Sequence, residues 1–307
     1  MDQVKKMILL QRLIQSYSEN SVDCGELLRD EIQLITNDMQ MFSNRDLHKQ
    51  YRNTLREMSA INEEQKLIKA QLYKHTTDLY RKEEVKILQK DYHNFSVRKN
   101  DASVAVERQV NQEETLPEFV KEIKNSISNY CDWRWAGIDL NPGNGLYIKS
   151  MLASDPLYLL KKFADVTSVK KKFNKFFSEK RLYFYDNLQT LPQNQLGIAI
   201  NINSYEFMPM DPIKENLEQV YKILRPGGHF IFTYNDCSKE KSLGFCVGGY
   251  RSYNSEEMMA NLVNLKGFDI VTAQCYKNAN SWMIVKKPGD LTTQKLSAPL
   301  VKIIRDQ

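Results

Sequence analysis

Small polar residues and glycines follow an apolar run in the middle of the chain. Residues 133–140 read WRWAGIDL, and residues 141–145 read NPGNG. An acid at a strand end, followed by Gly-x-Gly at a helix start, lets the backbone approach a ligand and directs helix N–H groups at it. The pattern predicts a site for a polar or anionic group. A dinucleotide site would need G-x-G-x-x-G, which is missing here.

Acids and amides also follow three later apolar runs. They are Asp186 and Asn187, Asn203 and Glu206, and Asn235 and Asp236. Because the carboxyl ends of parallel strands meet at one edge of a sheet, we expect these residues to gather in one site with Asp139. Asn and Asp are also common turn residues, so turn chemistry is the competing explanation for each position alone.

The elements that must position these residues alternate between strand and helix. Strands are predicted over 133–140, 157–160, 182–185, 196–202, 229–234, 268–276 and 281–286, and helices over 146–154, 164–179, 211–224 and 255–266. This alternation predicts an α/β fold, a Rossmann-like doubly wound sheet that is mostly parallel and has helices on both faces. The last two strands, joined by a short turn, predict an antiparallel edge.

The N-terminal third has a different composition. Residues 26–116 contain neither glycine nor proline, although the chain has 12 Gly and 9 Pro. A β or mixed domain needs these residues at its turns, so the region is predicted to be helical. Apolar residues recur at three- and four-residue spacing, with breaks. The break at residues 43–46 indicates either a turn in a helical hairpin or a stutter in one long helix.

These patterns divide the chain into four parts. They are a coiled-coil or helical-hairpin region (1–97), a polar linker (98–116), the α/β domain (117–290) and a C-terminal tail (291–307). A solitary long helix cannot bury its apolar seam. Residues 26–97 are therefore predicted to form a homo-oligomer or to dock on a partner, and the alternative is a bundle packed on the following domain.

Composition narrows the function further. No apolar run approaches the 18 residues of a membrane span, and the first residues lack a signal-peptide cleavage site, so a cytoplasmic protein without membrane attachment is expected. The five cysteines show no paired spacing, which favours free thiols and argues against a metal site. The basic cluster in residues 161–181 is interpreted as a solvated helix face, with an anionic partner such as nucleic acid as the weaker alternative.

Two motifs together resemble a known family. D-x-x-P-G-N-G after the first strand and L-R-P-G-G before a later one are similar in order and spacing to the class I S-adenosylmethionine-dependent methyltransferases, over about residues 125–290. The runs FTYNDC and NSWMIVKKPG look most like methyltransferase-like proteins of tailed phages. The resemblance implies S-adenosylmethionine as the cofactor. Its methionine end would be held by Asp139, Asn141, Gly143, Asn144 and Gly145, its adenine would lie near Asp186 and Asn187, and Asn203 would face the methyl group.

The resemblance also implies where an acceptor would bind. Asn235 and Asp236 would lie beside it, and Glu206 or Asp236 would be the base if the acceptor must lose a proton. A sulfonium is already an activated electrophile, so alignment without a metal is enough.

Two departures from the family pattern stand against full activity. Asn141 replaces a glycine of the loop. Lys161 and Lys162 stand where an acid would bind the ribose, and Asp165 is the nearest substitute. Two functions follow: a methyltransferase with an oligomerising helical arm, or a structural protein with reduced or lost activity, such as a phage virion component. The second would place the chain in a virion, and the first in the host cytoplasm if a phage encodes it.

Overall fold

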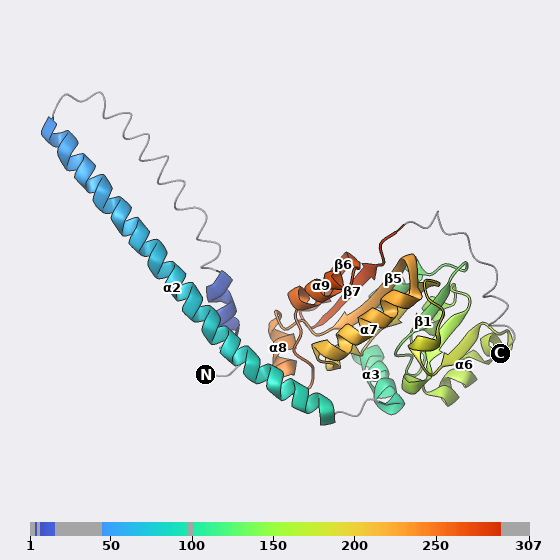
Figure 1. Ribbon diagram of the computed structural model, residues 1–307. Coiled ribbons are helices and arrows are strands. Elements are labelled where there is room, and N and C mark those ends of the chain that lie inside the picture. The colour runs from blue at the N-terminus through green and yellow to red at the C-terminus, as the bar shows by residue number, and fades with distance from the viewer. Residues whose placement is uncertain (1–3, 5–6, 16–44, 98–100, 290–307) are drawn as a thin grey trace. The chain divides into compact units, whose positions relative to one another are not determined.

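The computed structural model describes residues 4, 7–15, 45–97 and 101–289 (Figure 1). By its internal contacts the chain forms two compact units, Met1–Leu88 and Gln89–Gln307. Among the described residues, no helix combines the length and the apolar character that crossing a membrane requires.

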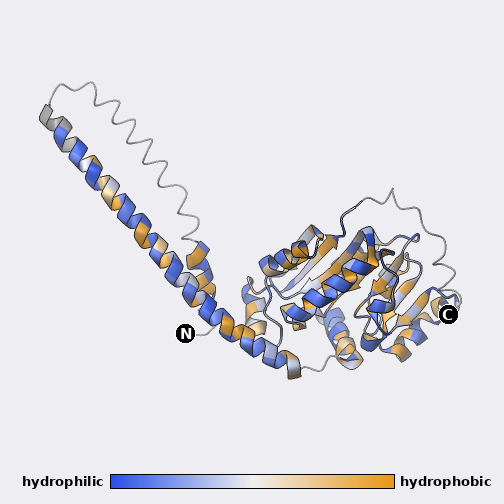
Figure 2. Cartoon of the chain, viewed as in Figure 1, coloured by the Kyte–Doolittle hydropathy of each residue, from blue (hydrophilic) through white to orange (hydrophobic). Residues whose placement is uncertain are grey.

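The first unit consists mainly of one long helix. Helix α2 (Arg45–Val97) runs without a break for 53 residues, a length of roughly 80 Å at 1.5 Å per residue, and its last turns belong to the second unit. It is largely hydrophilic, with isolated hydrophobic positions (Figure 2). Its side chains Ile61, Leu67 and Ile68 are about half exposed. The helical prediction is confirmed from residue 45 onward, and residues 45 and 46 of the predicted turn belong to α2. The apolar positions at 28–42 and residues 43 and 44 of that turn lie outside the described residues.

The second unit contains a sheet and its covering helices. The strands are β1 (Ala136–Asp139), β2 (Leu157–Leu160), β3 (Leu182–Tyr185), β4 (Leu196–Asn201), β5 (Leu224–Tyr234), β6 (Asp269–Tyr276) and β7 (Asn280–Lys286). The helices are α3 (Ala102–Thr115), α4 (Pro117–Tyr130), α5 (Ile148–Met151), α6 (Val166–Ser178), α7 (Met210–Ile223), α8 (Glu240–Val247) and α9 (Glu256–Leu265). Short 3₁₀ turns follow three of the strands: η2 (Lys161–Phe163), η3 (Leu188–Thr190) and η4 (Tyr205–Phe207).

The seven strands form a single sheet in the order β3-β2-β1-β4-β5-β7-β6. Strands β1 to β5 pair in parallel, and β7 runs antiparallel to both of its neighbours. The predicted fold class, including the antiparallel pair at the edge, is confirmed. The chain reverses its direction of travel across the sheet between β3 and β4, so the switch point lies between β1 and β4.

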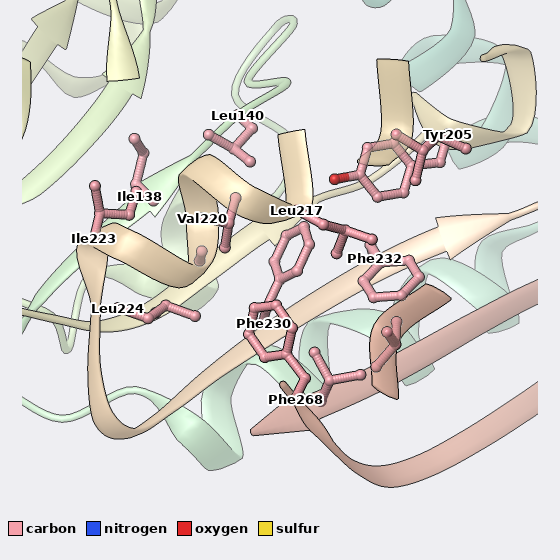
Figure 3. Close-up of a cluster of buried hydrophobic side chains, with 14 of the residues drawn as sticks. Ile138, Leu140, Tyr205, Leu217, Val220, Ile223, Leu224, Phe230, Phe232 and Phe268 are labelled. Atoms are coloured by element: carbon pink, nitrogen blue, oxygen red, sulfur yellow. The ribbon is translucent and has the colours of Figure 1, made fainter. Parts of the chain in front are cut away.

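Each face of the sheet has its own apolar core, because successive strand residues point to opposite sides. Phe230 and Phe232 of β5 pack with Leu217 of α7 on one face, as Figure 3 shows. Ile231, between them, packs on the other face with Phe119 of α4 and the inner side of α6. These cores fix the strands, and the strand ends carry the candidate site.

Residues 98–116, for which the sequence predicts a linker, contain a capped helix. Asp101 accepts a hydrogen bond from the Val104 N–H at the start of α3, and Pro117 begins α4 at a position that needs no backbone donor. Leu116 separates the two helices in a non-helical conformation. Polar composition alone favours a linker, but here a polar helix is held by partners elsewhere in the domain.

Candidate functional site

The loop after β1 has a backbone conformation that favours glycine at two positions. Gly143 has φ +50° and Gly145 has φ +87°, both in the left-handed region that favours glycine. A parallel bridge ties Gly143 to the segment after β2, since its N–H donates to the Phe163 carbonyl (2.9 Å) and its carbonyl accepts from the Asp165 N–H (2.8 Å). The loop is therefore folded against the neighbouring strand end.

Every N–H group of this loop has a partner within the chain. The Asn141 N–H donates to Asp139 Oδ1 (3.0 Å), and the Gly145 N–H donates to the Pro142 carbonyl (2.7 Å). The Asn144 N–H donates to Oε1 of Gln109 (3.0 Å), a side chain of helix α3. Asn144 is thus the loop position whose N–H is taken by a side chain from a distant part of the sequence.

Asp139 lies at the carboxyl end of β1 and is 1% exposed. Its Oδ1 accepts the Asn141 N–H, and its Oδ2 is buried without a hydrogen-bond partner. Burial raises the pKa of this carboxyl to about 7, with the Asn141 N–H acting weakly in the other direction. A buried carboxylate oxygen with no donor is costly and is suited to receive one from a ligand.

The β1 and β4 ends are joined by amide side chains. Asn141 Nδ2 donates to the Ile202 carbonyl (2.7 Å) and to the Asn203 carbonyl (3.3 Å). Asn203 has φ +61°, an uncommon conformation for a residue with a side chain, and its N–H donates to the Thr233 hydroxyl (2.8 Å). The structure therefore brings Asp139, Asn141 and Asn203 together at the switch point, as the sequence predicts.

Two glutamines of α3 complete this cluster, and sequence reasoning missed them. Gln109 is fully buried and Gln112 is 7% exposed. Gln112 and Asn203 exchange two amide hydrogen bonds (2.9 and 2.7 Å), and the Tyr147 hydroxyl donates to Gln112 Oε1 (2.7 Å). With the buried Ala105, they follow the i, i+4, i+7 spacing of one helix face, the sequence signal that could have marked them.

Glu206 lies in η4, after β4, and is buried. Burial raises the pKa of its carboxyl, opposed by the positive charges of Arg251 and Arg108 and by a hydrogen bond with Thr233. Its Oε2 has no hydrogen-bond partner. Burial raises the pKa of the Tyr147 phenol, and the charges of Glu206 and Asp139 raise it further.

Asn235 and Asp236, after β5, are fully buried and hold the backbone. Asn235 Nδ2 donates to the Ser242 carbonyl (3.2 Å) and the Ser252 carbonyl (2.9 Å). Asp236 Oδ1 accepts the Ser238 N–H and the Glu256 N–H, both at 3.1 Å. These contacts fix the turn after β5 to the segment before α9. Asn235 and Asp236 thus act as turn residues, the competing explanation for acids and amides at strand ends.

The ends of β2 and β3 are exposed. Lys161 forms an ion pair with Asp186 (3.4 Å), and the Asp186 side chain is 82% exposed. Asn187 caps η3, and Asp165 caps α6 by accepting the Ser168 N–H, so Asp165 is engaged in capping. Asp186 and Asn187 therefore lie outside the buried cluster at β1 and β4.

The basic cluster and the thiols have structural explanations. In α6, Val169 and Phe173 are buried while the lysines at 170–172 are exposed, and Lys172 donates to the Asn144 carbonyl (3.1 Å). The four described cysteines are free thiols. Within the described part of the chain, no group of three or more His, Cys, Asp or Glu side chains could hold a metal ion.

Comparison with known proteins gives a partial likeness in fold. No family model matches the chain, and no curated protein matches it. Among solved structures it is similar to the pyocyanin biosynthetic protein PhzM (13% identity, TM-score 0.43, covering 53% of this chain and 54% of PhzM). It is also similar to the [4+2]-cyclase SpnF (11% identity, TM-score 0.45, covering 55% of this chain and 81% of SpnF). A third similar structure is 1,6-didemethyltoxoflavin-N1-methyltransferase of Burkholderia thailandensis (15% identity, TM-score 0.46, covering 59% of this chain and 82% of that enzyme). The chain thus spans about half the length of PhzM.

Proposed function

We propose that the α/β domain binds S-adenosylmethionine at the carboxyl ends of β1 and β4 and transfers its methyl group to an acceptor. The observation that carries this proposal is the environment of Asp139. Its buried Oδ2 has no donor, and it lies beside a Gly-x-Gly loop at the switch point of the sheet. An ammonium group is the donor that such a carboxylate oxygen lacks.

The residues present fit the amino-acid end of this cofactor. Asp139 would accept from its ammonium group, and the Asn144 N–H would donate to its carboxylate when Gln109 gives up that hydrogen bond. They fit the ribose end poorly, because η2 begins with Lys161 and Lys162, and lysine offers no acceptor for two hydroxyls. Asp186 and Asn187, proposed near the adenine, would contribute only from the exposed side of the site.

The cofactor, when bound, supplies an electrophilic methyl group on a sulfonium. The chain would then align an acceptor and remove its proton where needed. Glu206 is the better candidate base, since its buried Oε2 has no hydrogen-bond partner and burial raises the pKa of its carboxyl. Asp236 already accepts two backbone N–H groups at Oδ1 and forms an ion pair with Lys239 at Oδ2 (3.8 Å). Asn235 donates to two backbone carbonyls, so both residues are proposed to shape the acceptor side.

The test is calorimetric titration of the full chain with S-adenosylmethionine and S-adenosylhomocysteine. Wild-type protein is expected to bind in the micromolar range, the Asp139→Ala variant to lose binding, and the variant of an exposed acid, Asp269→Ala, to keep it. The Gln109→Ala/Gln112→Ala variant lacks the side chains that hold α3 on the loop. The proposal would be overturned if neither wild type nor this variant bound either ligand.

A second candidate function is assembly, in a virion or another particle. Two observations favour it: α3 side chains already take the hydrogen bonds of the loop, and α2 exposes Ile61 and Ile68. Here α2 would form a homo-oligomer or dock on a structural partner. Sedimentation velocity of the full chain tests the oligomer. A monomer at high concentration that also fails to bind the cofactor would leave only docking on another protein.

A further inference from the structure

Helix α3 makes, from within the chain, the hydrogen bonds that a ligand of the β1 loop would need. Gln109 Oε1 accepts the Asn144 N–H (3.0 Å), and Gln109 Nε2 donates to the Asn141 carbonyl (2.9 Å). A carboxamide offers both an acceptor and a donor, and an amino acid offers the same pair in its carboxylate and ammonium. Gln109 therefore uses both kinds of contact that the loop can give.

The glycine of the loop shows how closely Gln109 fits. A methyl group added at Gly143 would lie 2.5 Å from Cδ and from Oε1 of Gln109, far inside contact distance. The space that the missing side chain leaves free, through which a backbone can approach a ligand, is thus filled by the carboxamide of Gln109. Gln112 occupies the adjoining position against Asn203 with its reciprocal pair of amide hydrogen bonds.

The rest of α3 makes few buried contacts: the Arg108 guanidinium lies over the Phe207 ring (3.6 Å), and Val104 and Val106 are half-buried. Ala105 is the one buried apolar residue that α3 contributes, and Val110 and Asn111 on its outer side are exposed. The following helix, α4, is anchored by buried Phe119 and Ile123. Leu116, between the two helices, has non-helical dihedral angles (φ −135°, ψ 52°), so α3 and α4 are separate helices with a joint between them.

We infer that α3 is an internal competitor at the site: Gln109 and Gln112 occupy the place of the amino-acid end of the cofactor, and the cofactor binds only when α3 withdraws. This inference rests on the proposed function. The hydrogen bonds of the two glutamines are then exchanged for those of the ligand, so the closed and the loaded site exclude each other.

The experiment compares S-adenosylhomocysteine binding by three full-length proteins in calorimetry: wild type, Gln109→Ala/Gln112→Ala, and Asn111→Ala. The last removes an exposed carboxamide from the outer side of α3 and is the matched control. The double variant is expected to bind at least tenfold more tightly than the other two. Equal or weaker binding by the double variant would overturn the inference and leave the proposed function intact. Absence of binding by all three would overturn both.

A second measurement needs no variant and guards against misfolding. Hydrogen–deuterium exchange of wild-type residues 102–115 is followed with and without saturating S-adenosylhomocysteine. Faster exchange in the presence of the ligand is expected, because α3 leaves its hydrogen-bonded position. Slower exchange would show that α3 is a lid that closes over the ligand, and would overturn the inference.

Discussion

The polar residues after β1 and β4 and those after β2 and β3 form two groups with opposite environments. After β1 and β4, Asp139 and Asn203 are buried and share their surroundings with the glutamines of α3. After β2 and β3, Lys161 and Asp186 meet in an exposed ion pair. The strands of both groups end at the same edge of the same sheet, and only the first group lies at the switch point.

This difference shows which property separates the two groups. Acid and amide side chains occur in both groups, so residue type does not separate them. Burial does, because a buried polar side chain must find a partner within the protein or in a ligand, whereas an exposed one is satisfied by water. The contrast can be tested by removing one side chain at a time from each group.

The largest effect is expected from Asp139, as a dependence of stability on pH. Its folded-state pKa of about 7 lies above the ordinary value of 3.8, so its contribution to stability is complete below about pH 4 and is lost as the pH rises to about 7. The wild-type free energy of unfolding, relative to that of Asp139→Asn, should fall by roughly 1.4 kcal/mol per pH unit within this window. Urea denaturation of both proteins at several pH values measures it. A difference that stays constant with pH would contradict the buried, neutral carboxyl.

The next effect is expected from Asn141, compared with Asn187 of the exposed group. Asn141→Ala removes two donors to the Ile202 and Asn203 carbonyls in a buried setting, and should cost about 2–4 kcal/mol of the free energy of unfolding. Asn187→Ala removes the cap of a short exposed turn, and should cost about 0.5–1 kcal/mol. Chemical denaturation compares the two. Equal losses would remove the distinction between the groups.

A smaller effect is expected from Tyr147. The Tyr147→Phe variant loses the hydroxyl that donates to Gln112 and should unfold about 1 kcal/mol more easily. Tyr250, which is mostly exposed, provides the control, and its Phe variant should differ from wild type by less than about 0.5 kcal/mol. Thermal unfolding followed by circular dichroism suffices. A Tyr147→Phe protein as stable as wild type would mean that this hydrogen bond does not help to hold α3.

The smallest effect is expected at the β2 end. Lys161→Ala breaks an ion pair whose two side chains are largely exposed, and should change the free energy of unfolding by less than about 0.5 kcal/mol. Because this ion pair contributes so little, 0.5 M salt should change the free energy of unfolding of the wild-type and variant proteins by the same amount. A loss above about 1 kcal/mol would mean that Lys161 supports the fold as the buried group does, and would contradict the difference between the two groups.

Much of the fold could be predicted because its signals are local. The run at 157–160 is apolar throughout and forms the fully buried strand β2, and the mostly apolar run at 229–234 forms the buried C-terminal part of β5. The Gly-x-Gly loop was recognisable because glycine is the residue that adopts positive φ without strain. Helix α8 was not predicted. Its eight residues include Gly244, which weakens a helix signal.

The site was predicted in part. Asp139, Asn141 and Asn203 meet as expected, because parallel strands bring their carboxyl ends to one edge. Asp186 and Asn187 were expected in the same site, yet they lie outside the buried cluster, since β3 is an edge strand of the sheet. The order of strands in a sheet is set by the packing of whole elements. The sequence around β3 therefore does not reveal that this strand lies at the edge.

The sequence by itself determined the alternation of strands and helices, the helical character of residues 45–97 and the backbone of the loop at residues 141–145. Each depends on residues adjacent along the chain, whose conformational preferences and apolar spacing act locally. Only the tertiary structure decided what fills that loop. Gln109 and Gln112 read as a polar linker, and their partners Asn141 and Asn203 lie 32 and 91 residues away. The fate of a polar side chain depends on whether distant segments exclude water around it, which the folded chain alone establishes.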